Sequence, residues 1–195
     1  MKTLIAATAT TALLAGAALA EPVSYELDPG HSQIVFTVDH LGFSTNHGMY
    51  SGFDGSIEFD QEDPANSSVE VSFPVRSMIT GWEPRFEHFM SDDFFAAGED
   101  DMVTFTSTSI DVTGEDTAEI TGDLTLNGVT KEVVLDTTLT QAGQHPMEGR
   151  PWAGFDATTT LLRSDYNLGA FAPAVSDEVE VMISIEAGEV QDGEG

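Results

Sequence analysis

Apolar and polar residues alternate with a period of two along most of this chain, and glycine, asparagine, aspartate or proline separates the alternating runs. A period of two places every second side chain on one face of a β-strand, and these separating residues favour turns. The pattern predicts an all-β fold. Its eight predicted strands cover residues 32–41, 45–59, 67–75, 102–112, 117–126, 129–140, 152–163 and 178–187.

One face of several predicted strands is clearly apolar. In residues 32–41 the apolar face includes Ile34, and in residues 45–59 it includes Ile57, with polar residues opposite in both runs. Because such a face needs to be covered, we expect it to point into the protein. The inward positions that we select from the strands as candidate ligand contacts are Phe36, Val38, His40, His47, Met49, Phe53 and Phe105.

Closing the sheet on itself is the arrangement that best satisfies eight such strands, because closure leaves no strand edge unpaired. We therefore predict an eight-stranded antiparallel barrel of the lipocalin type, with a short helical insertion between strands 3 and 4. Asn127-Gly128 between two alternating runs predicts a tight hairpin, since both residues tolerate positive φ angles. Eight strands leave a lumen that is filled by side chains or holds one slender ligand, and the pattern does not decide between them.

The predicted insertion, residues 82–97, is unusually rich in aromatic side chains. Pro84 suits the first turn of a helix, and Phe86, Phe89 and Met90 follow with helical spacing. We expect the insertion to form a wall or lid at a ligand entrance, the alternative being a plug that only packs on the core. Its candidate ligand contacts are Trp82, Arg85, Phe86, His88, Phe89, Phe94 and Phe95.

The first twenty residues have the layout of a secretory signal peptide. Lys2 precedes an apolar run, and the run ends at Ala18-Leu19-Ala20, which is typical of a cleavage site. We expect cleavage after Ala20, export to the periplasm, and a single domain over residues 21–195. The alternative is an N-terminal membrane anchor, but threonines interrupt the run and it is short for a bilayer. The chain has no cysteine, which excludes disulfides and thiolate metal sites.

The chain is strongly acidic, with 34 Asp and Glu against six Lys and Arg and a formal net charge of −28. Such a surface repels phosphate backbones and anionic lipid headgroups, so we expect no nucleic-acid partner and no stable membrane anchor. Either solubility or adaptation to a salty medium accounts for this charge. The sequence leaves a homodimer open.

The order of several segments resembles the YceI-like family, whose exported lipocalin-like barrels are associated with polyisoprenoid and quinone binding. The resemblance covers nearly the whole chain after residue 20, and it implies a lumen that holds an extended isoprenoid. Phe86 and Leu162 depart from the family pattern, which has Asp and Asn there. The segments are Asp-Pro-Gly-His-Ser at 28–32, Ile-Val-Phe-Thr-Val-Asp-His-Leu-Gly at 34–42, Gly-Phe-Asp-Gly-Ser-Ile at 52–57, Arg-Phe-Glu-His-Phe at 85–89, Ser-Asp-Asp-Phe-Phe at 91–95, Gly-Asp-Leu-Thr-Leu-Asn-Gly-Val-Thr-Lys at 122–131 and Leu-Arg-Ser-Asp-Tyr-Asn-Leu-Gly at 162–169.

The sequence gives little support for a metal site, a catalytic site or a charged headgroup site. His40 and His47 could approach each other at a barrel mouth, but no spacing matches a known metal motif. There is no Gly-x-Ser-x-Gly elbow and no thiol nucleophile. Arg85 and Arg163 either hold a ligand headgroup or bridge local carboxylates, and the bridge is favoured, for Arg163 with Asp165.

We therefore predict a periplasmic protein that holds a polyisoprenoid or a ubiquinone-like lipid in its lumen, for storage or transport. It would need no obligatory cofactor and catalyse nothing. Two alternatives stay open. One is a stress-related interaction protein with a filled barrel, and the other is a metal-dependent enzyme that uses His40 or His47.

Overall fold

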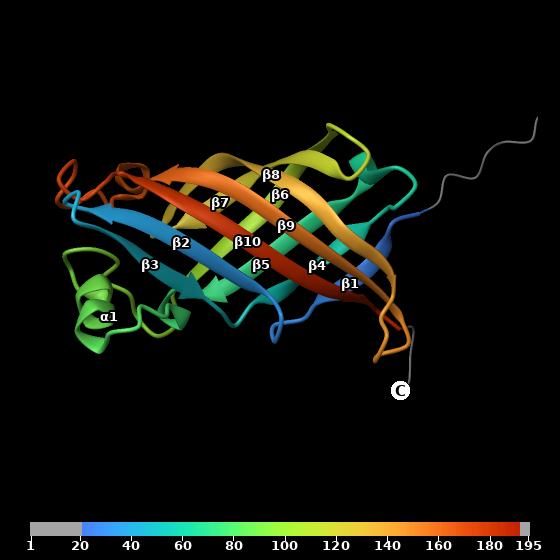
Figure 1. Cartoon of the computed structure of the whole chain (residues 1–195), viewed down its shortest axis with the longest axis horizontal. Coiled ribbons are helices and arrows are strands. Elements are labelled where there is room, and N and C mark those ends of the chain that lie inside the picture. Colours follow the sequence, from blue (N-terminus) through green and yellow to red (C-terminus); the bar gives the residue numbers. More distant parts are fainter. Residues whose placement is uncertain (1–20, 192–195) are drawn as a thin grey trace, which may run out of the picture.

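A computed structural model describes residues 21–191, so the predicted signal peptide lies outside the described residues. The chain forms an antiparallel sheet with one α-helix, α1 (Glu83–Met90), and three short 3-10 helices, η1 (Pro64–Asn66), η2 (Val75–Ser77) and η3 (Arg163–Tyr166). In Figure 1 the strands on the near side of the molecule run across those on the far side, and α1 lies at one end. The strands are β1 (Val23–Leu27), β2 (Gln33–His40), β3 (Ser44–Tyr50), β4 (Asp54–Phe59), β5 (Ser68–Pro74), β6 (Met102–Val112), β7 (Thr117–Leu126), β8 (Val129–Gln144), β9 (Pro151–Leu162) and β10 (Glu178–Glu189).

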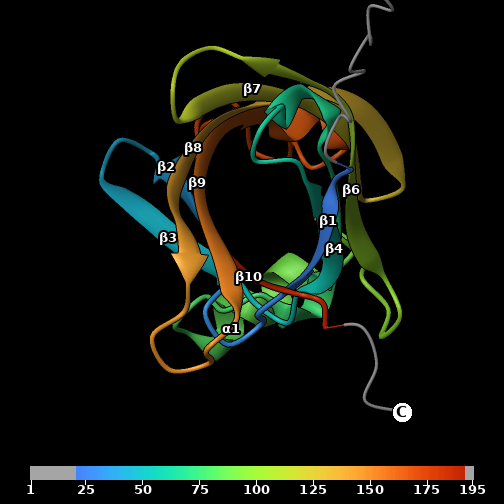
Figure 2. The same cartoon turned by 90° about the vertical axis from the view of Figure 1, so that its right-hand side faces the viewer.

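The sheet closes into a barrel. Its strand order is β1-β4-β5-β6-β7-β8-β9-β10-β2-β3, and β1 also pairs with β10, where Tyr25 lies opposite Glu189. The view along the barrel in Figure 2 shows the resulting ring of strands. The hydrogen-bonded ring from β1 through β4 to β10 contains eight strands, which confirms the predicted eight-stranded antiparallel barrel.

Two long strands of the barrel are interrupted, which explains why ten strands are observed where eight were predicted. β1 and β2 are separated by residues 28–32 and pair with β4 and β3 respectively, so together they form one side of a long hairpin. The predicted strand 45–59 is broken in the same way between Tyr50 and Asp54. β1 itself was missed as a strand, although Tyr25 and Leu27 alternate and are both buried.

The break between β3 and β4 reverses which residues face the barrel interior. Gly52 has a φ of +73°, a left-handed conformation that suits glycine. The break shifts the alternation by one residue, and such a shift exchanges the two faces of a strand. Tyr50 is therefore buried inside, whereas His47 is exposed. The expectation that His47 and Met49 face inward is wrong for this reason.

Two local predictions are confirmed. Asn127 and Gly128 have φ angles of +50° and +71° and connect β7 to β8, with Leu126 opposite Val129. The helical insertion lies between β5 and β6, and Pro84 is in the first turn of α1. Within residues 21–191, no helix is both long enough and apolar enough to cross a membrane.

Candidate functional site

The barrel encloses an apolar cavity with a volume of about 460 Å³. Every strand from β2 to β10 contributes to its wall, as does the end of the insertion. The lining side chains are mostly aliphatic and aromatic, as in pockets that bind apolar ligands. The lining that the strands supply includes Ile34, Phe36, Val38, Tyr50, Ile57, Phe59, Val69, Val71, Phe73, Val103, Phe105, Ile120, Leu124, Leu126, Val133, Leu135, Leu139, Phe155, Ala157, Val179, Val181, Ile183 and Ile185.

One side of the cavity is tightly packed with aromatic rings. Phe73 of β5 lies 5.0 Å from Tyr50 and 5.1 Å from Phe53, measured between ring centroids. Phe59 makes an edge contact with Phe155 at 5.4 Å. Tyr50, Phe53, Phe59 and Phe73 are all buried, so β3, β4 and β5 present a close-packed wall.

The opposite side is loosely packed. The inward side chains of β7 and β8 include Ile120, Val133 and Leu135, which are only half-buried and lie outside the buried core cluster. Their remaining exposed surface faces the cavity that they line. The lumen is therefore a hollow between one dense wall and one open wall.

Two glycines make room for rings that line the cavity. A Cβ atom on Gly48 would lie 2.1 Å from the Phe36 ring, and a Cβ atom on Gly122 would lie 2.4 Å from the Phe105 ring. Such distances are far below van der Waals contact, so any larger residue would push the ring into the lumen. These glycines allow both phenylalanines to lie flat against the wall.

Arg163 is the only cationic side chain that lines the cavity among the described residues. It does not pair with Asp165, which instead accepts from Lys131, so the predicted bridge is wrong. Arg163 donates to four backbone carbonyls, Nε to Ser176 and the two Nη atoms to Leu168, Ala170 and Val175. Burial lowers its pKa, while nearby Asp177 acts in the opposite direction. Its donors are thus engaged in holding the loop that follows η3.

Two tyrosines supply further polar groups in the lining, and burial raises the pKa of both Tyr50 and Tyr166. Both phenols are therefore neutral at physiological pH. Neutral phenols donate and accept hydrogen bonds without adding charge to the lumen.

At one end the cavity is lined by exposed polar residues that lie near η1 and in the turn between β6 and β7. They include Gln61, Ser68 and the consecutive residues Glu115, Asp116 and Thr117. Exposed lining residues mean that this end reaches solvent. The only charged groups in the lining there are carboxylates, so the opening is acidic.

The structure places seven of the fifteen predicted contacts around the cavity. They are Phe36, Val38, Phe89, Phe94, Phe95, Phe105 and Arg163. Because Phe89, Phe94 and Phe95 line the cavity, the end of the insertion forms part of its wall, and the rings of Phe89 and Phe94 lie 5.4 Å apart between centroids. The other eight do not line it: His40, His47, Met49, Phe53, Trp82, Arg85, Phe86 and His88.

Four of these eight residues lie in other surroundings. Phe53 packs behind Phe73, and Trp82 is 62 % exposed. Arg85 donates to the carbonyl of Thr80, and His88 contacts the carboxylate of Asp93.

His40 and His47 do not converge on a metal. His40 lies opposite Ser44 and His47 opposite Thr37 in the β2–β3 ladder. Paired residues share a face and alternate residues change face, so the two histidines point to opposite sides of the sheet. The possible approach of these histidines at a barrel mouth, which the sequence left open, therefore does not occur.

The inward face of β7, β8 and β10 was missed as a site. Its inward residues alternate as clearly as those of β2, and the strands themselves were predicted. Inward position in these strands was thus the signal that could have identified Ile120, Leu135, Val181 and Ile183 as lining residues. The predicted contacts were instead mostly aromatic or charged positions.

A closed antiparallel barrel with an apolar lumen defines a binding-protein fold of the lipocalin-like class. The model of the YceI-like domain matches residues 25–187, and the chain belongs to this family. It is 39% identical to a UPF0312 protein of Ectopseudomonas mendocina, over 90% of this chain and 92% of that protein.

Two solved structures share the fold. BcnA of Burkholderia cenocepacia superposes with a TM-score of 0.74 at 23% identity, covering 82% of this chain and 98% of BcnA. A polyisoprenoid binding domain from Saccharophagus degradans superposes with a TM-score of 0.67 at 16% identity, covering 86% and 99%.

Proposed function

We propose that this protein holds the apolar tail of a polyisoprenoid or isoprenoid quinone inside its barrel, in the periplasm, for storage or transport. The observation that carries the proposal is the apolar cavity of about 460 Å³, whose size lies within the range of small-molecule pockets. Removing each methylene of the tail from water contributes roughly 0.8 kcal/mol. The polyisoprenoid binding domain of Saccharophagus degradans, which has the same fold, supports this ligand class.

The cargo that fits this lumen best has an uncharged headgroup. Arg163, the only lining cation among the described residues, is held by four backbone carbonyls. The solvent end carries Glu115 and Asp116, which repel a carboxylate or a phosphate. An alcohol or a quinone avoids this repulsion. Charge therefore favours a polyprenol or quinone over a fatty acid or a phosphorylated isoprenoid.

We propose a binding role without catalysis, with residues 1–20 as the export signal. The family is a binding-protein fold, which supports the binding role. Among the described residues, the lining of the cavity is mostly apolar and does not present paired acidic and basic side chains, which supports the absence of catalysis. The filled-barrel alternative requires a lumen without continuous free volume. The continuous cavity of about 460 Å³ argues against that alternative.

Two measurements on purified protein test the proposal. First, an organic-solvent extract is analysed by mass spectrometry for isoprenoid lipids. Second, lipid-free protein is titrated with a short-chain ubiquinone and, as the charge control, with a fatty acid of similar length. We expect an isoprenoid in the extract and at least tenfold tighter binding of the quinone. Absence of isoprenoid together with no quinone uptake would contradict the proposed function.

A further inference from the structure

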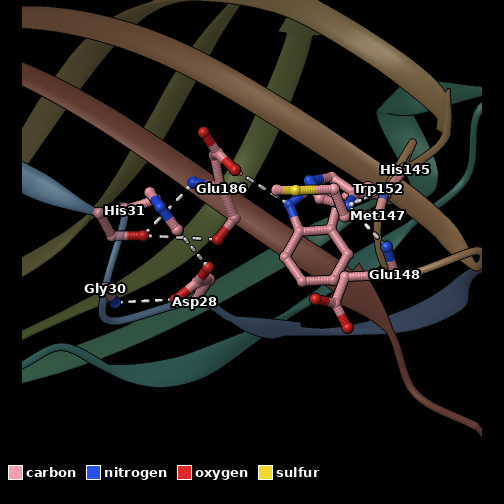
Figure 3. A network of polar contacts seen from close by, with 9 residues as sticks. Asp28, Gly30, His31, His145, Met147, Glu148, Trp152 and Glu186 are labelled. Carbon is pink, nitrogen blue, oxygen red and sulfur yellow. Dashed lines mark hydrogen bonds and ion pairs between the residues drawn. The ribbon is translucent and has the colours of Figure 1, made fainter.

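A cluster of metal-ligating side chains lies outside the lumen, where the segment between β1 and β2 passes over β10. Asp28 and His31 belong to that segment, and Glu186 belongs to β10. Ile185 lines the cavity, so its neighbour Glu186 lies on the outer face of the barrel. Figure 3 shows the His31 ring between the two carboxylates.

The three side chains are close enough to share one ion. Nδ1 of His31 lies 2.7 Å from Oδ2 of Asp28, and one ligand atom from each residue lies within 4.8 Å of the other two. A zinc ion sits about 2.0–2.2 Å from nitrogen and oxygen ligands, which sets those ligands roughly 3–3.5 Å apart. The present spacing of the three ligand atoms is therefore within roughly 2 Å of the spacing that one zinc ion needs.

Neighbouring groups already orient both carboxylates. The Gly30 amide donates to Oδ1 of Asp28 at 2.8 Å, which leaves Oδ2 directed at His31. The indole Nε1 of Trp152 donates to Oε2 of Glu186 at 3.3 Å. Such outer contacts are what fix carboxylate ligands in metal sites. Figure 3 shows Trp152 beside Glu186, with His145 next to the indole.

The electrostatic environment also favours a cation. His31 donates a hydrogen bond to the carboxylate of Asp28, and this bond together with the charges of Asp28 and Glu186 raises the pKa of His31, so the imidazole sits in a negative potential. One imidazole and two carboxylates are ligands of the kind that zinc accepts, whereas calcium and magnesium prefer oxygen ligands alone.

We propose that Asp28, His31 and Glu186 bind one divalent transition-metal ion of the zinc class on the outer wall of the barrel. The ion would join the segment that interrupts the first long strand to the C-terminal part of β10. Water completes the coordination, because three protein ligands leave a fourth position open. The site is independent of the lumen and of whatever lipid the lumen holds.

Isothermal titration calorimetry with zinc chloride tests this site on tag-free, chelator-treated protein. Millimolar magnesium chloride is included, because it occupies the acidic surface without competing for an imidazole site. We expect one zinc ion per chain and at least tenfold weaker binding in His31→Ala and in Glu186→Gln. Zinc should also raise the melting temperature of the wild type and not that of His31→Ala.

Two control variants distinguish a specific zinc site from nonspecific attraction of zinc to surface carboxylates. His47→Ala removes another exposed histidine, and Glu180→Gln removes another carboxylate of β10. Both should bind zinc as the wild type does, and circular dichroism should show the same fold for all variants. The proposal would be overturned if His31→Ala bound zinc as tightly as the wild type. It would also be overturned if the two control variants lost zinc binding to the same extent, or if magnesium abolished zinc binding.

Discussion

The two walls of the lumen are built from the same alternating pattern, yet they are packed very differently. On β4 and β5, Ile57, Phe59 and Phe73 are buried against one another and against neighbouring aromatic rings. On β8, Val133 and Leu135 also point inward, but each keeps surface that faces the cavity. The dense wall holds the fold together, and the open wall leaves room for a ligand.

This contrast shows that inward position and complete burial are separate properties. Large aromatic side chains contact one another in the dense wall, whereas the aliphatic side chains of Ile120, Val133 and Leu135 line the open wall outside the buried core cluster. Stability and binding should therefore respond to different substitutions.

The largest effect is expected in the dense wall. Phe73→Ala should lower the free energy of unfolding of the lipid-free protein by about 3–5 kcal/mol, because it opens a cavity among buried rings. Leu135→Ala in the open wall should cost only roughly 1 kcal/mol, since its side chain is half-buried. Urea unfolding of both variants measures the difference. Equal costs would mean that the two walls are not packed differently.

Filling the hollow should affect binding instead. Leu135→Trp places a large ring in the lumen, so we expect at least a tenfold loss of quinone binding with less than about 1 kcal/mol change in stability. Val134→Trp on the outer face is the matched control and should bind normally. Titration and urea unfolding give the two values. If Leu135→Trp unfolded as readily as Phe73→Ala, the hollow would not exist in solution.

The insertion should behave like the open wall. Replacing Phe89 and Phe94 together by Ser removes two rings that line the cavity, and should lower lipid occupancy far more than the melting temperature of the lipid-free protein. Phe43→Ser, in a turn where the ring is 91 % exposed, serves as the control. A loss of several kcal/mol in lipid-free stability would instead assign these rings to ordinary core packing.

The smallest effect concerns the loop that Arg163 holds. Asp177 accepts hydrogen bonds from the amide and hydroxyl of Ser164, and these contacts lower its pKa below the ordinary 3.8. Its stabilising contribution is therefore present above about pH 4 and is lost as the pH falls through the lower pKa of the folded state. The melting-temperature advantage of wild type over Asp177→Asn should shrink below pH 4. An advantage that is constant from pH 7 to pH 2 would contradict this assignment.

The sequence predicted most of the fold because local patterns determine it. Strand alternation located β5 to β10 closely, and Asn127-Gly128 identified its hairpin. The reversal of faces at Gly52 was not predictable from alternation alone, because one glycine sufficed to shift the register. The carbonyls around Arg163 come from a loop that only the folded chain brings back to that side chain. The same limit applies to the hollow, since free volume depends on distances across the barrel.

β3 has a mechanical consequence for the barrel. It pairs along its length with β2, but on its other side the described chain offers only the bridge between Met49 and Ile79, with two backbone hydrogen bonds. The ring is closed through β1 and β10, but in the part of the barrel that β2 and β3 form, the free side of β3 is held least firmly and should open first. We expect the amides of Met49 and Ile79 to exchange with deuterium faster than those of the β8–β9 ladder. A long chain admitted there would enter sideways along its length, without being threaded through an end.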